Sequence, residues 1–151
     1  MKLSRKAEYA LLTMMDLSMK MGDGLARAGE IARRQGIPLK FLEQILIALR
    51  EGGLVASRRG SRGGYLLAVS PHRISVGAVV RLVQGQPPPQ SSSPVHGASR
   101  QDPGEAARMV LQNMMAEVDA AVSRQVEGVT IAELCVRVRA RTGGEARMFD
   151  I

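Results

Sequence analysis

Two short amphipathic segments separated by a two-residue break are the feature that most limits the fold of this chain. The first segment covers about residues 28–35, and the second begins at Pro38, a residue favoured in the first turn of a helix. Only Gly36 and Ile37 lie between them, and glycine readily adopts the left-handed conformation that ends a helix. The apolar positions expected to face inward on the second segment are Leu39, Leu42, Ile45, Leu46 and Leu49. This pattern predicts a helix-turn-helix.

A β-hairpin is predicted directly after the second helix. Residues 54–57 and 65–69 are short runs of strand-forming side chains, and residues 58–64 between them form a glycine-rich turn. The turn contains the basic residues Arg58, Arg59 and Arg62. A basic hairpin beside a recognition helix is typical of a wing, whose arginines meet phosphates or enter the minor groove.

Two further helices complete the predicted N-terminal domain. Ser4 is expected to cap a helix that runs to about Met21, and Ser75 is expected to cap a helix over residues 76–83. The predicted fold class is therefore mainly α with a small β wing. Residues 1–84 form a winged helix-turn-helix DNA-binding domain in this interpretation.

Composition changes sharply after this domain. Residues 85–104 carry almost no apolar side chain, which predicts a mobile loop rich in proline and serine. The prolines in this segment are Pro87, Pro88, Pro89, Pro94 and Pro103.

A long amphipathic helix is predicted from Glu105 to about Gln125. Its apolar stripe consists of Ala107, Leu111, Met114, Met115, Val118 and Val122. One helix cannot bury such a stripe alone, so it either pairs with the same helix of a second chain or folds back on its own domain. A last helix begins at a capping box of Thr130 and Glu133. We assign residues 105–142 to the dimerisation helix and C-terminal helix, and residues 143–151 to a disordered tail.

The positive charge of the chain is confined to its first part. Residues 1–85 hold 14 Lys and Arg against 6 Asp and Glu, whereas residues 86–151 hold 7 against 8. This distribution favours a polyanionic partner such as nucleic acid, although basic surfaces also serve solubility. No apolar run reaches the ~18 residues of a membrane span, and no signal core is present, so we expect a cytoplasmic protein without membrane contact.

Several motifs, in order and spacing, resemble the Rrf-two family of bacterial winged-helix transcriptional regulators, the family of IscR, NsrR and CymR. The resemblance is dense over about residues 1–85 and looser to residue 134. It implies a homodimer with a long dimerisation helix, double-stranded DNA with a palindromic operator as the partner, and a repressor or activator role. The motifs are Met1-Lys2-Leu3-Ser4, Tyr9-Ala10-Leu11, Ile31-Ala32-Arg33-Arg34-Gln35-Gly36-Ile37, Leu42-Glu43-Gln44, Leu49-Arg50, Gly53-Leu54-Val55, Arg59-Gly60-Ser61-Arg62-Gly63-Gly64-Tyr65, Ile74-Ser75-Val76-Gly77 and Thr130-Ile131-Ala132-Glu133-Leu134.

The resemblance also indicates which side chains bind DNA. Chemically, Glu43 can accept from a cytosine amine and Gln44 can pair with adenine, whereas Lys40 suits a phosphate as well as a base. Glu43 also fits the alternative of a solvated surface charge. The DNA-binding residues assigned in this way are Arg33, Pro38, Lys40, Phe41, Glu43, Gln44, Arg50, Arg58, Arg59, Ser61 and Arg62.

The sequence departs from the family pattern where some relatives bind an iron–sulfur cluster. Those relatives place three cysteines in the segment that corresponds to residues 90–99, and here that segment contains serines and His96 but no cysteine. Serine is a poor substitute for a thiolate toward iron, so we expect no cluster and assign no metal ligands. Glu8 is a possible oxygen donor or a plain surface residue. The single cysteine, Cys135, fits a buried structural thiol better than a reactive one.

The function expected from the sequence is that of a homodimeric, sequence-specific DNA-binding transcriptional regulator, and no constellation of an enzyme is present. Two alternatives stay open. The chain acts by docking on a partner enzyme, or it senses a metal, a cluster or redox change through an unrecognised ligand set. A partner protein or small effector is compatible with all three hypotheses.

Overall fold

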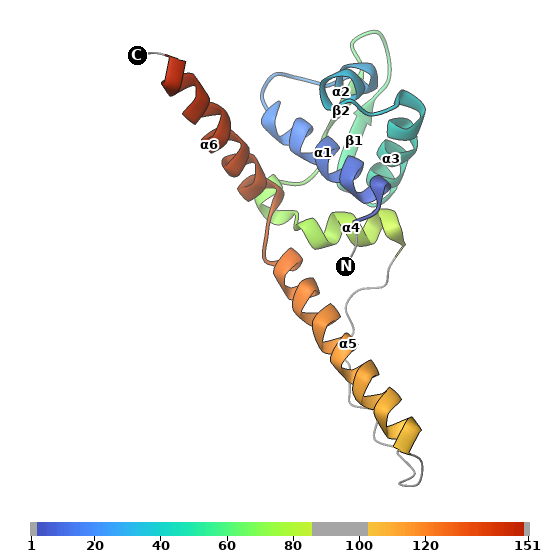
Figure 1. Cartoon of the computed structure of the whole chain (residues 1–151). Helices are drawn as coiled ribbons and strands as arrows, with labels where there is room; N and C mark the ends of the chain where they lie inside the picture. The colour runs from blue at the N-terminus through green and yellow to red at the C-terminus, as the bar shows by residue number, and fades with distance from the viewer. Residues whose placement is uncertain (1–2, 86–102, 150–151) are drawn as a thin grey trace.

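This computed structural model describes residues 3–85 and 103–149, the last six of them as backbone only. The order of elements begins with three helices and a hairpin and ends with three further helices (Figure 1). The elements are α1 (Arg5–Met19), α2 (Ala28–Gln35), α3 (Leu39–Glu51), β1 (Val55–Arg58), β2 (Gly64–Leu67), the 3-10 helix η1 (Pro71–Arg73), α4 (Val76–Gln84), α5 (Pro103–Glu127) and α6 (Ile131–Phe149).

Helix α1 lies at the centre of the N-terminal domain, where α2, α3, α4, β2 and α6 all pack against it. Its first turn is capped as predicted, because the Ser4 hydroxyl accepts a hydrogen bond of 3.1 Å from the Ala7 N–H. The helix ends at Met19 rather than at about Met21, since Gly22 adopts a positive φ of 95° in the following turn. Met21 lies beyond the end of the helix and is 57% exposed.

The helix-turn-helix forms as predicted. Helix α2 ends at Gly36, whose φ of 65° and ψ of 34° are left-handed, and α3 follows with Pro38 as its N-cap residue. The buried apolar residues of α3 are Leu42, Ile45, Leu46 and Leu49. Leu39 was expected to join them, but it is 45% exposed. The prediction was wrong at this position because the whole first turn of α3, residues 38–41, projects beyond the core.

The wing is a two-stranded antiparallel sheet in which Val55 pairs with Leu67 and Arg58 with Gly64. Each strand lies within two residues of its predicted place. Ala26, between α1 and α2, adds a bridge to the outer edge of β2, where its backbone exchanges hydrogen bonds of 3.0 and 2.8 Å with Tyr65. The start of β2, next to the turn of the wing, is therefore tied by backbone to the segment that precedes α2.

The last two helices leave the core in different directions (Figure 1). The first turns of α6 pack on α1 and η1, and Ile131 and Cys135 belong to the core. Helix α6 continues to Phe149, although we expected a disordered tail from residue 143. Two glycines at 143 and 144 cost about 1 kcal/mol each in a helix interior, which alanines and charged helix formers around them offset.

Helix α5 extends away from the domain, and it contains no buried residue in its described length. It begins at Pro103, inside the predicted loop 85–104, most of which lies outside the described residues. Proline at the start of a helix is favourable because its missing N–H has no partner there in any case. Within the described residues, no helix is long and apolar enough to cross a membrane.

Candidate nucleic-acid interface

The exposed face of α3 carries the side chains predicted to read DNA bases. Pro38, Lys40, Glu43 and Gln44 are all exposed, and so is Arg50 two turns further along. The buried residues of α3 lie between them in sequence, so one face anchors the helix and the opposite face is free for a major groove.

Phe41 has a packing role in addition to the predicted contact with DNA. Its ring lies edge-on to that of Tyr9 on α1, with ring centroids 5.5 Å apart and an interplanar angle of 79°. The guanidinium of Arg5 lies 6.0 Å from the centre of the same Tyr9 ring. Phe41 is 37% exposed, so it fixes the first turn of α3 on α1 and still presents an edge to solvent.

An ion pair sets the position of α2 relative to α1. Arg34 donates to both carboxylate oxygens of Asp16, at 3.0 and 2.7 Å, and Gln35 donates to the same carboxylate at 2.9 Å. Burial by itself raises the pKa of Asp16, but the hydrogen bonds from Arg34 and Gln35 and the nearby positive charges outweigh it, so the pKa is lowered. Arg34 is thus a structural residue, whereas Arg33 beside it is exposed.

The turn of the wing is compact and exposed. Gly60 has a φ of +111°, which favours glycine, and the Gly63 N–H donates to the Gly60 carbonyl at 3.0 Å. Arg59, Ser61 and Arg62 are all exposed on this turn, as a wing contact with DNA requires.

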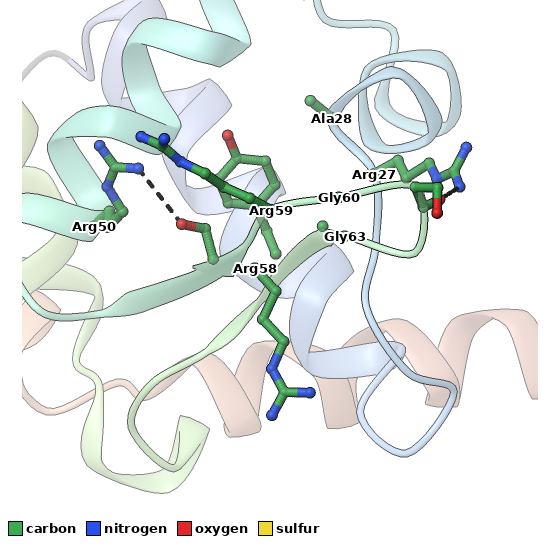
Figure 2. Close-up of a pocket in the computed structure, with 11 residues that line it drawn as sticks. Arg27, Ala28, Arg50, Arg58, Arg59, Gly60 and Gly63 are labelled. Atoms are coloured by element: carbon green, nitrogen blue, oxygen red, sulfur yellow. Dashed lines mark hydrogen bonds between the residues drawn. The ribbon is translucent and has the colours of Figure 1, made fainter.

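A hollow of about 480 Å³ lies between the wing and the start of α2 (Figure 2). Arg50 from α3 and Arg59 from the wing extend on the same side of it, and Arg50 donates a long hydrogen bond of 3.5 Å to the Ser57 hydroxyl. Arg58, the last residue of β1, points to the opposite side of the hairpin from Arg59, the first residue of the turn. The predicted wing arginines therefore do not form one group.

One residue of this region was missed in the sequence. Arg27 lines the hollow, and its guanidinium donates a hydrogen bond to the carbonyl oxygen of Ser61 at the tip of the wing. The two residues are 34 positions apart, so no local pattern links them.

Several basic side chains of the candidate interface are available to bind phosphates. Among the side chains described in residues 3–85 and 103–143, no carboxylate lies in ion-pair distance of Arg33, Lys40, Arg59 or Arg62. Their charge is available for the counterions or phosphates of a nucleic acid.

The apolar stripe of α5 lies open to solvent. Leu111 is 56% exposed, Met114 50%, Met115 51% and Val118 48%, and Ala107 is exposed as well. Val122, near the domain, is half-buried. Val110, which the sequence analysis did not include, is 68% exposed beside the stripe. This exposure disagrees with the alternative in which the helix folds back and buries its stripe on its own domain.

The C-terminal end of α5 is joined to the domain through Glu127. Its carboxylate accepts a hydrogen bond of 2.9 Å from the Ser75 hydroxyl and forms an ion pair with Arg81. A side chain at Gly77 would collide with that carboxylate, so glycine permits the close approach. Backbone hydrogen bonds from Val76 to Val129 and from Ile131 to Ile74 complete the junction.

Two of the possible metal donors, Cys135 and Glu8, lie within the described residues, in different surroundings. Cys135 is 3% exposed, with its sulfur 3.7 Å from the Met15 carbonyl oxygen, whereas Glu8 is exposed on α1. In the described part of the chain, no three His, Cys, Asp or Glu side chains are placed to hold an ion. His96 and the segment 90–99 lie outside the described residues.

The sequence is similar to transcriptional regulators over most of its length. Residues 3–137 match the Rrf2 family model, described as an iron-dependent transcriptional regulator. The chain is 34% identical over 136 residues to the HTH-type transcriptional regulator IscR of Aliivibrio salmonicida, which covers 90% of this chain and 78% of that protein. The IscR of Yersinia enterocolitica is 34% identical over 134 residues, or 89% of this chain and 79% of its own.

Solved structures have the same fold. IscR of T. potens superposes with a TM-score of 0.72 at 30% identity, over 91% of this chain and 88% of that one. CymR, the global cysteine regulator of B. subtilis, superposes with a TM-score of 0.71 at 29% identity, over 91% of this chain and 98% of that one.

Proposed function

Because the chain belongs to the Rrf2 family of transcriptional regulators, we propose that it acts as a homodimer that binds a palindromic operator and carries no iron–sulfur cluster. The observation that carries the proposal is the combination of an exposed polar face on α3 with an arginine-bearing wing beside it (Figures 1 and 2). The chain is not an enzyme. Because its proposed target is operator DNA, we place the chain in the cytoplasm.

In the proposed complex, α3 lies in the major groove and the wing contacts the flanking backbone or minor groove. Glu43 and Gln44 contact base edges, and Lys40 contacts a phosphate or a base. Arg50 and Arg59, which extend on the same side of the hollow, bind the backbone at the edge of the helix contact. The remaining proposed contacts with DNA are all exposed side chains: Arg33, Pro38, Ser61 and Arg62.

The exposed stripe of helix α5 supports the proposed homodimer. A stripe of Leu, Met and Val side chains that are about half exposed is costly in water and gains free energy when a matching helix covers it. A two-fold partner offers an identical stripe and also brings a second α3 to the DNA. Two heads related by a two-fold axis read an inverted repeat.

The absence of a cluster is inferred from the donor set. The chain has one cysteine, so it cannot supply the several thiolates that hold a cluster within one chain. That cysteine is buried with its sulfur next to the Met15 carbonyl of α1, whereas Glu8 is exposed to solvent. Although the family model is described as iron-dependent, the segment of residues 90–99, where cluster-binding relatives place their cysteines, contains none here. Iron analysis and a visible absorption spectrum after anaerobic purification test this point, and stoichiometric iron would contradict it.

The DNA-binding proposal is tested with purified protein and a duplex from the promoter region of its own gene. We expect saturable binding that unrelated DNA does not displace and that weakens steeply with salt. Glu43→Ala should lower the preference for the operator over unrelated DNA, because it removes a base contact, whereas Arg33→Ala should weaken binding to both duplexes equally. Equal affinity of the wild-type protein for operator and unrelated DNA would overturn the proposal.

A further inference from the structure

Arg27 connects the tip of the wing to the start of α2. Its guanidinium donates a hydrogen bond to the carbonyl oxygen of Ser61, and both residues line the hollow shown in Figure 2. We propose that Arg27 is a positioning residue, which holds the wing in the orientation in which its arginines bind DNA. This inference rests on the proposed function and adds to it a residue outside α3 and the wing.

The backbone at Arg27 is fixed on both sides. Ala26 immediately before it is tied to Tyr65 of β2 by two backbone hydrogen bonds of 3.0 and 2.8 Å. The N–H of Arg27 itself donates to the Glu30 carboxylate at 3.3 Å, in the first turn of α2. The side chain therefore starts from a point that belongs to both the wing sheet and the helix-turn-helix.

The tip of the wing needs an external contact to keep its direction. Its internal hydrogen bond, from the Gly63 N–H to the Gly60 carbonyl, spans Ser61; in an exposed turn this one bond opens readily unless Ser61 is held, and it does not fix the angle of the tip to α3. Residues 58–62 are all exposed, so apolar packing does not hold the tip either. Among the described residues, the side-chain hydrogen bond that reaches this tip from outside the hairpin is that of Arg27.

The guanidinium also suits this task chemically. It presents several donors in a planar fork, so one N–H can bind the Ser61 carbonyl while the charge stays near the phosphates that the wing approaches. The competing assignment is a direct phosphate contact by Arg27, in which its effect on DNA binding would not depend on the wing.

A double-mutant cycle separates these assignments. Operator affinity is measured at low salt for Arg27→Ala in the wild-type chain and in an Arg59→Ala, Arg62→Ala background. A positioning role predicts a loss of about fivefold in the wild-type chain, the size of one net hydrogen bond, and almost none in the background that lacks the wing arginines. The matched control is Arg33→Ala, an exposed arginine on α2 that should cost the same factor in both backgrounds.

Hydrogen exchange in the free protein provides a readout that needs no DNA. In Arg27→Ala, the Gly63 amide should exchange severalfold faster, whereas the Tyr65 amide, bonded to the Ala26 backbone, should be unchanged. An equal loss of affinity in both backgrounds, or an unchanged Gly63 exchange rate, would overturn the inference. Failure of the wild-type protein to prefer its operator would overturn the proposed function instead, and the exchange measurement would still decide whether Arg27 holds the wing.

Discussion

Among single residues, neighbouring arginines of the helix-turn-helix and the wing have different roles, and the sequence alone does not distinguish these roles. Arg33 and Arg34 are neighbours, yet only Arg34 forms an ion pair with Asp16 of α1. Arg58 and Arg59 are neighbours as well, yet they point to opposite sides of the hairpin. Periodicity predicts which face a side chain occupies, but partners 18 residues away depend on how whole helices pack.

Removing the buried carboxylate should destabilise the domain. Asp16→Asn leaves Arg34 without its charged partner, and we expect a loss of about 2 kcal/mol in the free energy of unfolding at pH 7, because breaking a buried pair is costly. Denaturant unfolding measures this. The control is Asp23→Asn, which removes the exposed pair with Lys20 at 3.9 Å and should cost almost nothing.

The same loss should depend on pH in a defined direction. The pKa of Asp16 is lower in the folded chain than in the unfolded chain, so the ion pair stabilises the fold above the unfolded pKa, which is about 4. That contribution disappears as the pH falls through the folded pKa. The difference between wild type and Asp16→Asn should therefore shrink below about pH 4, and a difference that grows there would contradict the assignment.

The opposite orientations of the wing arginines give a second prediction. Arg59→Ala should weaken operator binding by about tenfold, the cost of one good DNA contact, whereas Arg58→Ala should weaken it far less because its side chain points away from Arg50 and α3. Fluorescence anisotropy with a labelled operator measures both. Equal losses for the two variants would contradict the prediction, because they would mean that both side chains contact the operator in the complex.

At the scale of elements, local signals located the helices well. Ser4 and Ser75 accept the capping hydrogen bonds predicted for them, and Gly36 has the left-handed conformation that separates α2 from α3. These features are local because each involves residues three or four positions apart. The extent of α6 was not predicted, since glycine at two adjacent positions usually ends a helix and here does not.

The apolar stripe of α5 supports a prediction on the oligomeric state. Met114→Glu puts a charge at the centre of the proposed helix pair, where burial of an unpaired carboxylate is costly, so the dimer should dissociate. The control is Asn113→Glu, an exposed position on the opposite face of the helix. Light scattering should give twice the 16.3 kDa chain mass for wild type and Asn113→Glu and the single-chain mass for Met114→Glu. A monomeric wild-type protein would contradict the assignment.

At the scale of the whole molecule, the sequence predicted a basic N-terminal domain followed by a long amphipathic helix, and it left open whether that helix folds back on the domain. The joint between them was not predicted, because Glu127 meets Ser75 and Arg81 across about 50 residues of intervening chain. Through these contacts and the backbone hydrogen bonds beside them, α5 is joined to the DNA-binding domain at a defined place. A second copy docked on α5 would thereby fix the separation of the two α3 helices.

The most direct test of a dimeric, operator-binding regulator is to select genomic DNA fragments with the purified full-length chain and to sequence them. We expect one enriched motif that is an inverted repeat, with half-sites about 34 Å or one helical turn apart, as two heads on a two-fold axis require. Met114→Glu should lose the enrichment of the full repeat. Enrichment of a single unrepeated half-site by the wild-type protein, or of no motif, would contradict a dimeric operator-binding regulator.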